Sequence, residues 1–319
     1  MNQSKIYPPA VETRASLIQR LWIYQKERFP IFKHTILIAT FTFSAIAYAR
    51  LCRGAAGFIP WYDYLAGVFM TFTLFLLLRI ADEFKDQKED AKYRAYLPVP
   101  RGLVLLSELK KMAMITLGLQ AIVIIFFQPA LWKLFLLVLV YLSLMRVEFF
   151  IPKWLKQQPI LYMTSHMMII PLIDYFASGL DWLNAGTTAP KGILFFFIVS
   201  FLNGIVLEFG RKIKAPQSEE PGVQSYTSLY GTKKAVIYWL IVLLLTAITS
   251  ALAANYANFS LAMQLIFPAI AILLSVPAIL FIRKPSDQAA KWIENSSGIW
   301  TLSMYLLLGG LPMLINLIN

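Results

Sequence analysis

The chain has 319 residues, of which 58% are hydrophobic and 14% are charged, with a formal net charge of +12. Soluble domains carry about 25% charged residues, so this composition excludes ordinary soluble enzymes, disordered chains and disulfide scaffolds. One cysteine, Cys52, and two histidines also exclude an intramolecular disulfide and metal sites built on cysteine or histidine clusters. We expect an integral membrane protein with no nucleic-acid partner, its positive charge gathered in cytoplasmic loops.

Residues 14–32 mix leucine, isoleucine, tryptophan and phenylalanine with arginine and lysine. This pattern predicts an amphipathic helix lying at the membrane surface, in an N-terminal segment (1–33) that is not a cleavable signal peptide. Nine stretches long enough to cross the hydrocarbon core as helices follow it. They are predicted at residues 34–51, 61–81, 103–127, 130–146, 159–180, 191–209, 234–254, 260–282 and 298–316. The fold class is therefore all-α, a polytopic membrane protein whose nine-helix domain spans residues 34–319.

The lysines and arginines indicate how these helices are oriented, because cytoplasmic loops carry most basic residues in membrane proteins. Twenty-five of the 29 lie in the N-terminal segment or in and beside the connections after the second, fourth, sixth and eighth stretches. The remaining four are Arg50, Arg53, Lys133 and Lys191. The bias predicts that the N-terminus and these connections face the cytoplasm, which places the C-terminus outside.

Acidic residues are scarce, yet five of the 17 fall in residues 82–90, directly after the second stretch. If the second helix continues beyond the membrane, Asp82, Asp86 and Asp90 line one face, because residues four apart are neighbours on a helix. Mg²⁺ neutralises such a ladder well, since it is held by one or two carboxylates plus substrate phosphates. The ladder is roughly 12 Å long, which favours two or more ions bridged by an anionic ligand. The alternative is a solvated charged loop whose lysine partners are Lys85, Lys88 and Lys92.

Two further features favour a binding site over a solvated loop. The acidic stretch is followed by Arg94 and by the proline- and glycine-containing segment 97–102, which includes Arg101. The connection after the sixth stretch repeats the mixture of acids and bases, with Glu208, Arg211 and Lys212. Both connections follow even-numbered stretches and so face one compartment. Together they predict a site for a metal-bound diphosphate at the cytoplasmic end of a helical bundle.

These residues resemble the UbiA superfamily of intramembrane prenyltransferases, whose nine helices surround a central cavity. The family's first motif, Asn-Asp-x-x-Asp-x-x-x-Asp followed by Arg-Pro-x-Pro-x-Gly, is similar to Asp82-Glu83-x-x-Asp86-x-x-x-Asp90 followed by Leu97-Pro98-Val99-Pro100-Arg101-Gly102. Asp82 replaces the asparagine and Leu97 the arginine, leaving Arg94 or Arg101 as substitutes. The second motif matches only at Gly222, Ser225 and Gly231, because Glu219 and Glu220 are out of register.

The resemblance implies an enzyme that ionises an isoprenyl diphosphate with the help of Mg²⁺. It assigns Asp82, Asp86 and Asp90 to catalysis and metal binding. Further metal ligands would be Glu83 and Glu208, and the diphosphate contacts would be Arg94, Arg101, Arg211 and Lys212. The prenyl cation then reacts either with a lipophilic acceptor, which is prenyl transfer, or with its own double bonds, which is terpene cyclisation. The expected location is a bacterial inner membrane, in contact with lipid, with both motif loops in the cytoplasm.

A transporter is the competing class, because transport sites use buried ionisable residues on broken helices near the bilayer midplane. The candidates are His166 and Asp174 in the fifth stretch and Asn203 in the sixth. Each of them is also explained as a buried polar residue satisfied by a neighbour, or as part of the cavity lining. The acidic residues gather at the ends of the predicted helices and not at their centres, which favours the enzyme.

Overall fold

The computed structural model describes residues 15–318. Every regular element in this part of the chain is helical, and nine spans are long and apolar enough to cross a membrane. The α-helices are α1 (Leu17–Arg28), α2 (Ile31–Arg53), α3 (Trp61–Lys85), α4 (Gln87–Tyr93), α5 (Leu106–Phe126), α6 (Trp132–Arg146), α7 (Pro152–Lys156), α8 (Pro159–Met167), α9 (Ile169–Trp182), α10 (Ile193–Lys212), α11 (Tyr226–Tyr230), α12 (Thr232–Tyr256), α13 (Leu261–Arg283), α14 (Asp287–Tyr305) and α15 (Leu311–Ile318). Short helical turns η2 (Pro129–Leu131), η3 (Glu148–Phe150), η4 (Pro216–Ser218) and η5 (Leu306–Gly310) complete the set.

The predicted all-α, nine-span architecture is confirmed, with helix ends that differ by a few residues from the sequence prediction. The ninth span differs most: it begins at Asp287 and not at residue 298. Residues 287–297 are too polar to register as a membrane stretch, but Ser286 caps their first turn by accepting a hydrogen bond from the Ala289 amide. A serine N-cap satisfies an amide that would otherwise lack a partner and so fixes where the helix starts.

The fifth span is interrupted. The helix α8 ends at Met167 and α9 begins at Ile169, so the break falls at Met168. Proline accounts for local irregularity elsewhere: Pro268 and Pro277 lie inside α13 without ending it, which membrane helices tolerate. Both prolines lie in a span whose most apolar window is only 22% buried, so α13 is at the outside of the bundle.

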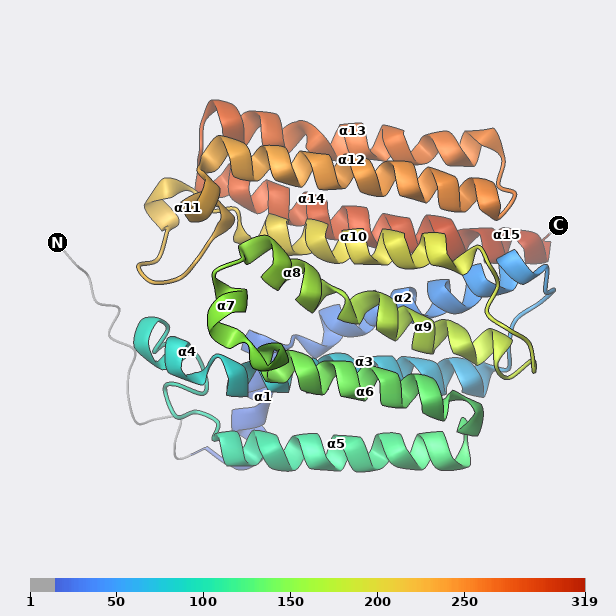
Figure 1. Ribbon diagram of the computed structural model, residues 1–319, viewed down its shortest axis with the longest axis horizontal. Helices are drawn as coiled ribbons and strands as arrows, with labels where there is room; N and C mark the ends of the chain where they lie inside the picture. Colours follow the sequence, from blue (N-terminus) through green and yellow to red (C-terminus); the bar gives the residue numbers. More distant parts are fainter. Residues whose placement is uncertain (1–14, 319) are drawn as a thin grey trace.

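The long helices run side by side along the longest axis of the molecule (Figure 1). The short helices α1, α4, α7 and α11 gather at one end, which we call the motif end, and the C-terminus lies at the other (Figure 1). This placement agrees with the alternation of the spans, because α4 follows the second span and α11 the sixth, and the two connections therefore lie at the same end. The N-terminal residues 1–14, including Lys5 and Arg14, lie outside the described part of the chain.

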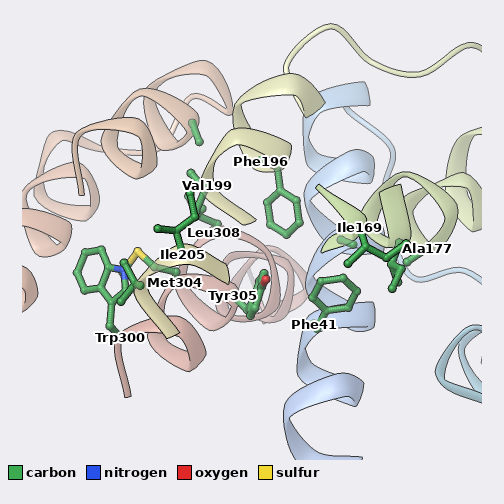
Figure 2. Close-up of a cluster of buried hydrophobic side chains, with 14 of the residues drawn as sticks. Phe41, Ile169, Ala177, Phe196, Val199, Ile205, Trp300, Met304, Tyr305 and Leu308 are labelled. Carbon is green, nitrogen blue, oxygen red and sulfur yellow. The ribbon is translucent and has the colours of Figure 1, made fainter. Parts of the chain in front are cut away.

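The helices α2, α9, α10 and α14 form the centre of the bundle, where aromatic side chains pack together (Figure 2). Gly309 lies directly against the backbone of α2, where an added Cβ atom would come within 2.3 Å of the Ser44 carbonyl oxygen. Far from the motif end, Arg50 and Arg53 both hydrogen-bond the buried Asp181 carboxylate at 2.7–3.0 Å. These contacts tie the C-terminal end of α2 to the C-terminal end of α9.

Candidate active site at the motif end

The acidic ladder is bent at Asp86. The helix α3 ends at Lys85, Asp86 caps it with φ −91° and ψ 3°, and α4 begins at Gln87. The expectation that Asp82, Asp86 and Asp90 line one face of a continuing helix is therefore wrong. The bend keeps Asp82 and Asp86 together and turns Asp90 towards the N-terminal helix, where its side chain is buried.

Lys85 lies between the two carboxylates that stay together. Its Nζ is 3.5 Å from Asp82 Oδ1 and 3.8 Å from Asp86 Oδ1, and it donates a hydrogen bond to the Tyr162 hydroxyl at 2.9 Å. Burial raises the pKa of Asp86 to about 6; Lys85 opposes that rise, whereas Asp82, Asp90 and Glu89 add to it. Lys85 thus already places a positive charge between Asp82 and Asp86, and the raised pKa of Asp86 brings its protonation closer to neutral pH.

A small pocket opens beside this pair, between α3, α6 and α8. We call it the rim pocket; its lining is Leu78, Ala81, Asp82, Lys85, Leu142, Met145, Arg146 and His166. Polar groups face it from three helices, whereas the rest of its wall is apolar. Arg146 stands over the ring of Phe84, with its guanidinium carbon 5.2 Å from the ring centre. The lining of the rim pocket therefore combines charged side chains with an apolar wall.

His166 lines the rim pocket, and one of its ring nitrogens has no hydrogen-bond partner among the described residues. Its Nδ1 lies 2.8 Å from the Tyr162 carbonyl oxygen, and because a carbonyl only accepts, Nδ1 carries the proton and Nε2 carries the lone pair. Nε2 is buried and has no hydrogen-bond partner among the described residues. The imidazole is stacked on the Tyr162 ring at 4.1 Å. His166 can accept a hydrogen bond from, or coordinate, whatever occupies the pocket.

The second motif loop contributes charge from α10. Glu208 binds Arg211 at 2.6 Å and Lys212 at 2.7 Å, with its own side chain only 14% exposed. Arg211 lies close enough to Asp82, and His166 close enough to both Asp82 and Glu208, for electrostatic interaction. The predicted residues Asp82, Asp86, Glu208, Arg211 and Lys212 therefore gather around one end of the bundle.

Two of the predicted metal ligands are paired elsewhere. Glu83 is 1% exposed and accepts hydrogen bonds from Arg28 at 2.7 Å and Arg79 at 2.9 Å. Asp90 is bound by Arg94 at 2.5 Å, with Arg28 at 3.9 Å; burial raises its pKa, and both arginines oppose that rise. Both carboxylates therefore anchor α1 and α4 to the end of α3.

Of the four predicted diphosphate contacts, two lie beside Glu208 and two are paired with carboxylates elsewhere. Arg211 and Lys212 lie beside Glu208, with side chains 61% and 36% exposed. Arg94 pairs with Asp90, and Arg101 binds both carboxylate oxygens of Glu27 on α1 at 2.9 Å and the Tyr96 carbonyl. Lys85 and Tyr162 belong to the site although the sequence analysis assigned them no role there. Helical spacing could have identified both as neighbours of singled-out residues, because Lys85 lies three residues after Asp82 and Tyr162 lies four residues before His166.

The two motif loops dock against each other. Gly222 has φ +79°, and an added Cβ atom would lie 2.1 Å from the Tyr93 ring of α4. The Tyr96 hydroxyl donates to Glu220 at 3.3 Å. Glu219 points inward instead and accepts hydrogen bonds from the hydroxyls of Ser225 and Thr227 at 2.6 Å, which fixes the start of α11. Glu219 and Glu220, which are out of register with the family motif, thus stabilise the conformation of this loop.

The donor set indicates what metal complex the site could hold. Within residues 15–318 no group of three or more His, Cys, Asp or Glu side chains is arranged to hold a metal ion. Mg²⁺ needs fewer protein ligands when it is bound with a substrate, since one or two carboxylates plus phosphates suffice. Asp82 and Asp86 would therefore be sufficient protein ligands for a magnesium–diphosphate complex.

Comparison with known proteins supports the fold. No model of a known protein family matches the chain, and no curated protein sequence matches it. A solved structure described as digeranylgeranylglyceryl phosphate synthase in membranes is similar to it, with a TM-score of 0.62 and 17% sequence identity. The similarity covers 92% of this chain and 99% of that chain. The nine-helix fold that the UbiA resemblance implied is thereby confirmed.

Proposed function

We propose that this protein is an intramembrane prenyltransferase that ionises an isoprenyl diphosphate and transfers the prenyl group to an acceptor. The observation that carries the proposal is the rim pocket at one end of an apolar bundle, where Asp82, Lys85 and Arg146 meet an apolar wall and Asp86 lies 3.8 Å from Lys85. A charged head and a long apolar tail are the two parts of an isoprenyl diphosphate. The solved structure of similar fold is a UbiA-superfamily prenyltransferase, which supports the same reaction class.

Asp82 and Asp86 hold Mg²⁺ in this proposal, and the metal neutralises charge on the diphosphate when bound. Lys85, Arg146 and Arg211 supply further positive charge from three different helices. The allylic carbon–oxygen bond breaks, its electron pair leaves with the diphosphate, and the prenyl chain becomes a carbocation. Preorganised positive groups around the leaving oxygen stabilise that charge where it develops.

The remaining predicted residues have two different roles in this proposal. Glu208 holds Arg211 and Lys212 beside the leaving group. Glu83, Asp90, Arg94 and Arg101 position α1, α4 and the loop that follows α4. The motif end faces the cytoplasm of a bacterial cell, where soluble diphosphates are available, and the apolar helices keep water from the cation.

The decisive experiment uses purified protein in lipid nanodiscs with Mg²⁺ and either farnesyl or geranylgeranyl diphosphate. Diphosphate release is measured, and extracted products are identified by mass spectrometry, with and without lipophilic alcohols as acceptors. We expect Mg²⁺-dependent release and a prenylated acceptor. Cyclic hydrocarbons formed without acceptor would instead make the protein a terpene cyclase. Intact diphosphate under every condition would overturn ionisation altogether.

Asp86→Ala is the matching variant, and Glu89→Ala is its control. Glu89 lies three residues away on α4, is exposed, and pairs with Lys156 outside the rim pocket. We expect Asp86→Ala to lose roughly 100-fold or more of the diphosphate release, with unchanged thermal stability, and Glu89→Ala to retain it. Equal activity in the two variants would remove Asp86 from the site.

A further inference from the structure

The turn between α6 and α7 holds three consecutive residues in the left-handed region of backbone conformation. Glu148, Phe149 and Phe150 have φ values of +47°, +53° and +63°, and none of them is glycine. Residues with a side chain visit this region rarely and as single residues, because the Cβ atom crowds the following carbonyl oxygen. The run is therefore strained, and strain of this kind persists only where the surrounding structure holds it in place.

The side chains of this turn show what holds it. Glu148 is a carboxylate yet only 5% exposed, whereas Phe150 is 77% exposed. The Phe149 ring packs edge-on against the rings of His166 and Tyr141, with ring centres 6.1 and 5.6 Å apart. Glu148 and Phe149 therefore lie against the side of the rim pocket formed by α6 and α8. The helix α7, which follows the turn, lies at the motif end (Figure 1).

Glu148 is connected to the rim pocket through Tyr162. The Tyr162 hydroxyl donates a hydrogen bond to Glu148 Oε1 at 3.3 Å and accepts one from Lys85 Nζ at 2.9 Å. The direction of both hydrogen bonds is fixed, because an ammonium group only donates and a carboxylate only accepts. The phenol therefore bridges the two charged groups, and through it the turn after α6 is linked to the end of α3.

This bridge affects where the Lys85 ammonium group lies. Its Nζ is 3.5 Å from Asp82 and 3.8 Å from Asp86, but only 2.9 Å from the neutral Tyr162 hydroxyl. A hydroxyl that donates to a carboxylate becomes a stronger acceptor, because hydrogen bonds in a chain polarise one another. The contact with Tyr162, strengthened by Glu148, thus competes with the attraction of the two carboxylates for Lys85.

The ion pair of Glu148 with Lys156 does not account for its burial. Lys156 Nζ is 3.6 Å from Glu148 but 2.6 Å from Glu89, and the Lys156 side chain is 41% exposed. Ion pairs that reach solvent contribute little to stability, whereas a buried carboxylate is costly unless it is hydrogen-bonded. The hydrogen bond from Tyr162 is therefore the interaction that a buried Glu148 serves.

We propose that Glu148 is a positioning residue that, through the Tyr162 hydroxyl, holds Lys85 at the rim pocket for contact with the substrate diphosphate. Glu148 itself does not touch the substrate; it fixes the direction of the hydroxyl that accepts from Lys85. The strained turn keeps the carboxylate within reach of that hydroxyl. The inference rests on the proposed function and adds to it a residue from outside both motif loops.

The test measures ligand binding without turnover. Purified protein in lipid nanodiscs with Mg²⁺ is titrated calorimetrically with a farnesyl diphosphate analogue whose bridging oxygen is replaced by sulfur, which slows ionisation. We expect Tyr162→Phe and Glu148→Met each to raise Kd about tenfold, as for the loss of a hydrogen bond to a charged group. Tyr141→Phe is the control, because its hydroxyl donates to the Ser165 carbonyl at 2.7 Å instead, and it should leave Kd unchanged. A tenfold rise in Tyr141→Phe as well would overturn the proposal.

Rescue and coupling distinguish positioning from a merely structural role. Glu148→Gln keeps an oxygen that accepts from Tyr162 and should recover most of the affinity that Glu148→Met loses. Tyr162→Phe combined with Glu148→Met should bind no more weakly than Tyr162→Phe alone, because Glu148 acts only through the hydroxyl. An unchanged Kd in Tyr162→Phe, equal Kd values in Glu148→Gln and Glu148→Met, or losses that multiply in the double variant would each overturn the proposal. If Glu148→Met does not fold, Glu148→Asp, which withdraws the carboxylate from the hydroxyl, takes its place in every comparison.

The same measurements separate this proposal from the proposed function. Diphosphate release by the wild-type protein with an unchanged Kd in Tyr162→Phe and Glu148→Met would overturn the role of Glu148 and leave the enzyme standing. Analogue binding without any diphosphate release from farnesyl or geranylgeranyl diphosphate would overturn the proposed function, while the Kd values would still decide the role of Glu148. No binding of the analogue to the wild-type protein would overturn both.

Discussion

At the scale of single residues, the proposed metal role of Asp86 leads to a prediction about pH. Its pKa is raised from 3.8 to about 6 in the folded protein, so folding favours the protonated form, and this group's contribution to stability falls as pH rises from about 4 to 6. Metal binding has the opposite preference, because Mg²⁺ needs the carboxylate. We therefore expect the affinity of the proposed site for Mg²⁺ to increase as pH rises through 6.

The measurement is the Mg²⁺ concentration that gives half-maximal diphosphate release, followed from pH 5 to pH 7.5. We expect it to rise about tenfold for each pH unit below 6 in the wild-type protein, since one proton competes with the metal. Asp86→Asn, which cannot titrate, should show weak binding with little pH dependence. A flat wild-type profile would contradict a metal role for Asp86.

Glu83 and Asp82 are neighbours in sequence with opposite roles. Glu83 is buried against Arg28 and Arg79, whereas Asp82 is 32% exposed and lines the rim pocket. Removing one partner of a buried ion pair leaves an uncompensated charge, so Glu83→Gln should lower the free energy of unfolding by about 3 kcal/mol. Asp82→Asn should leave stability unchanged and reduce turnover. Chemical denaturation and diphosphate release, measured on both variants, test this contrast; equal stability losses would contradict it.

At the scale of elements, the contact between α4 and the loop before α11 decides whether the two motif loops act together. Gly222 combines a positive φ of +79° with a Tyr93 ring where its Cβ would be. Gly222→Ala therefore meets both backbone strain and a clash, which favours separation of the loops. We expect faster proteolysis of the segment 214–225 and a higher KM for the prenyl diphosphate, with kcat less affected. Tyr93→Ala with Gly222→Ala should recover part of the loss, whereas an unchanged KM in Gly222→Ala would show that docking is unimportant.

The bend at Asp86 explains why the site could be predicted only in part. Residues four apart at 82, 86 and 90 are neighbours on any continuous helix, and the sequence carries no proline or glycine there to announce the break. Their fates depend on partners distant in sequence: Arg28 lies more than 50 residues before Glu83, and Tyr162 lies 77 residues after Lys85. Spacing along one helix therefore predicted which residue types gather, and tertiary contacts decided which of them face the pocket.

At the scale of the whole molecule, the membrane requirement made most of the fold predictable. A spanning helix must be about 20 apolar residues long, so nine hydrophobic stretches identified nine spans. The hydrophobic pattern did not reveal that the fifth span is divided into α8 and α9, because a break at Met168 does not change the hydropathy of the span. The proximity of Asp174, Ser200 and Tyr305 was equally hidden: these residues come from three helices, and only packing brings them together.

The orientation of the whole bundle follows from its charge and gives the last prediction. The motif end carries α1, α4, α7 and α11 (Figure 1). Most lysines and arginines of the sequence lie in or beside these helices and the connections around them, so we expect from the positive-inside bias that this end faces the cytoplasm. Cysteine labelling in intact bacterial cells tests this, in a background where Cys52 is replaced by serine. Lys88→Cys on α4 should react with a membrane-impermeant maleimide only after lysis, and Asn258→Cys, in the exposed turn between α12 and α13, should react before it. The reverse pattern would place the rim pocket outside, away from soluble diphosphates, and would contradict the proposed route of the substrate as well as the orientation.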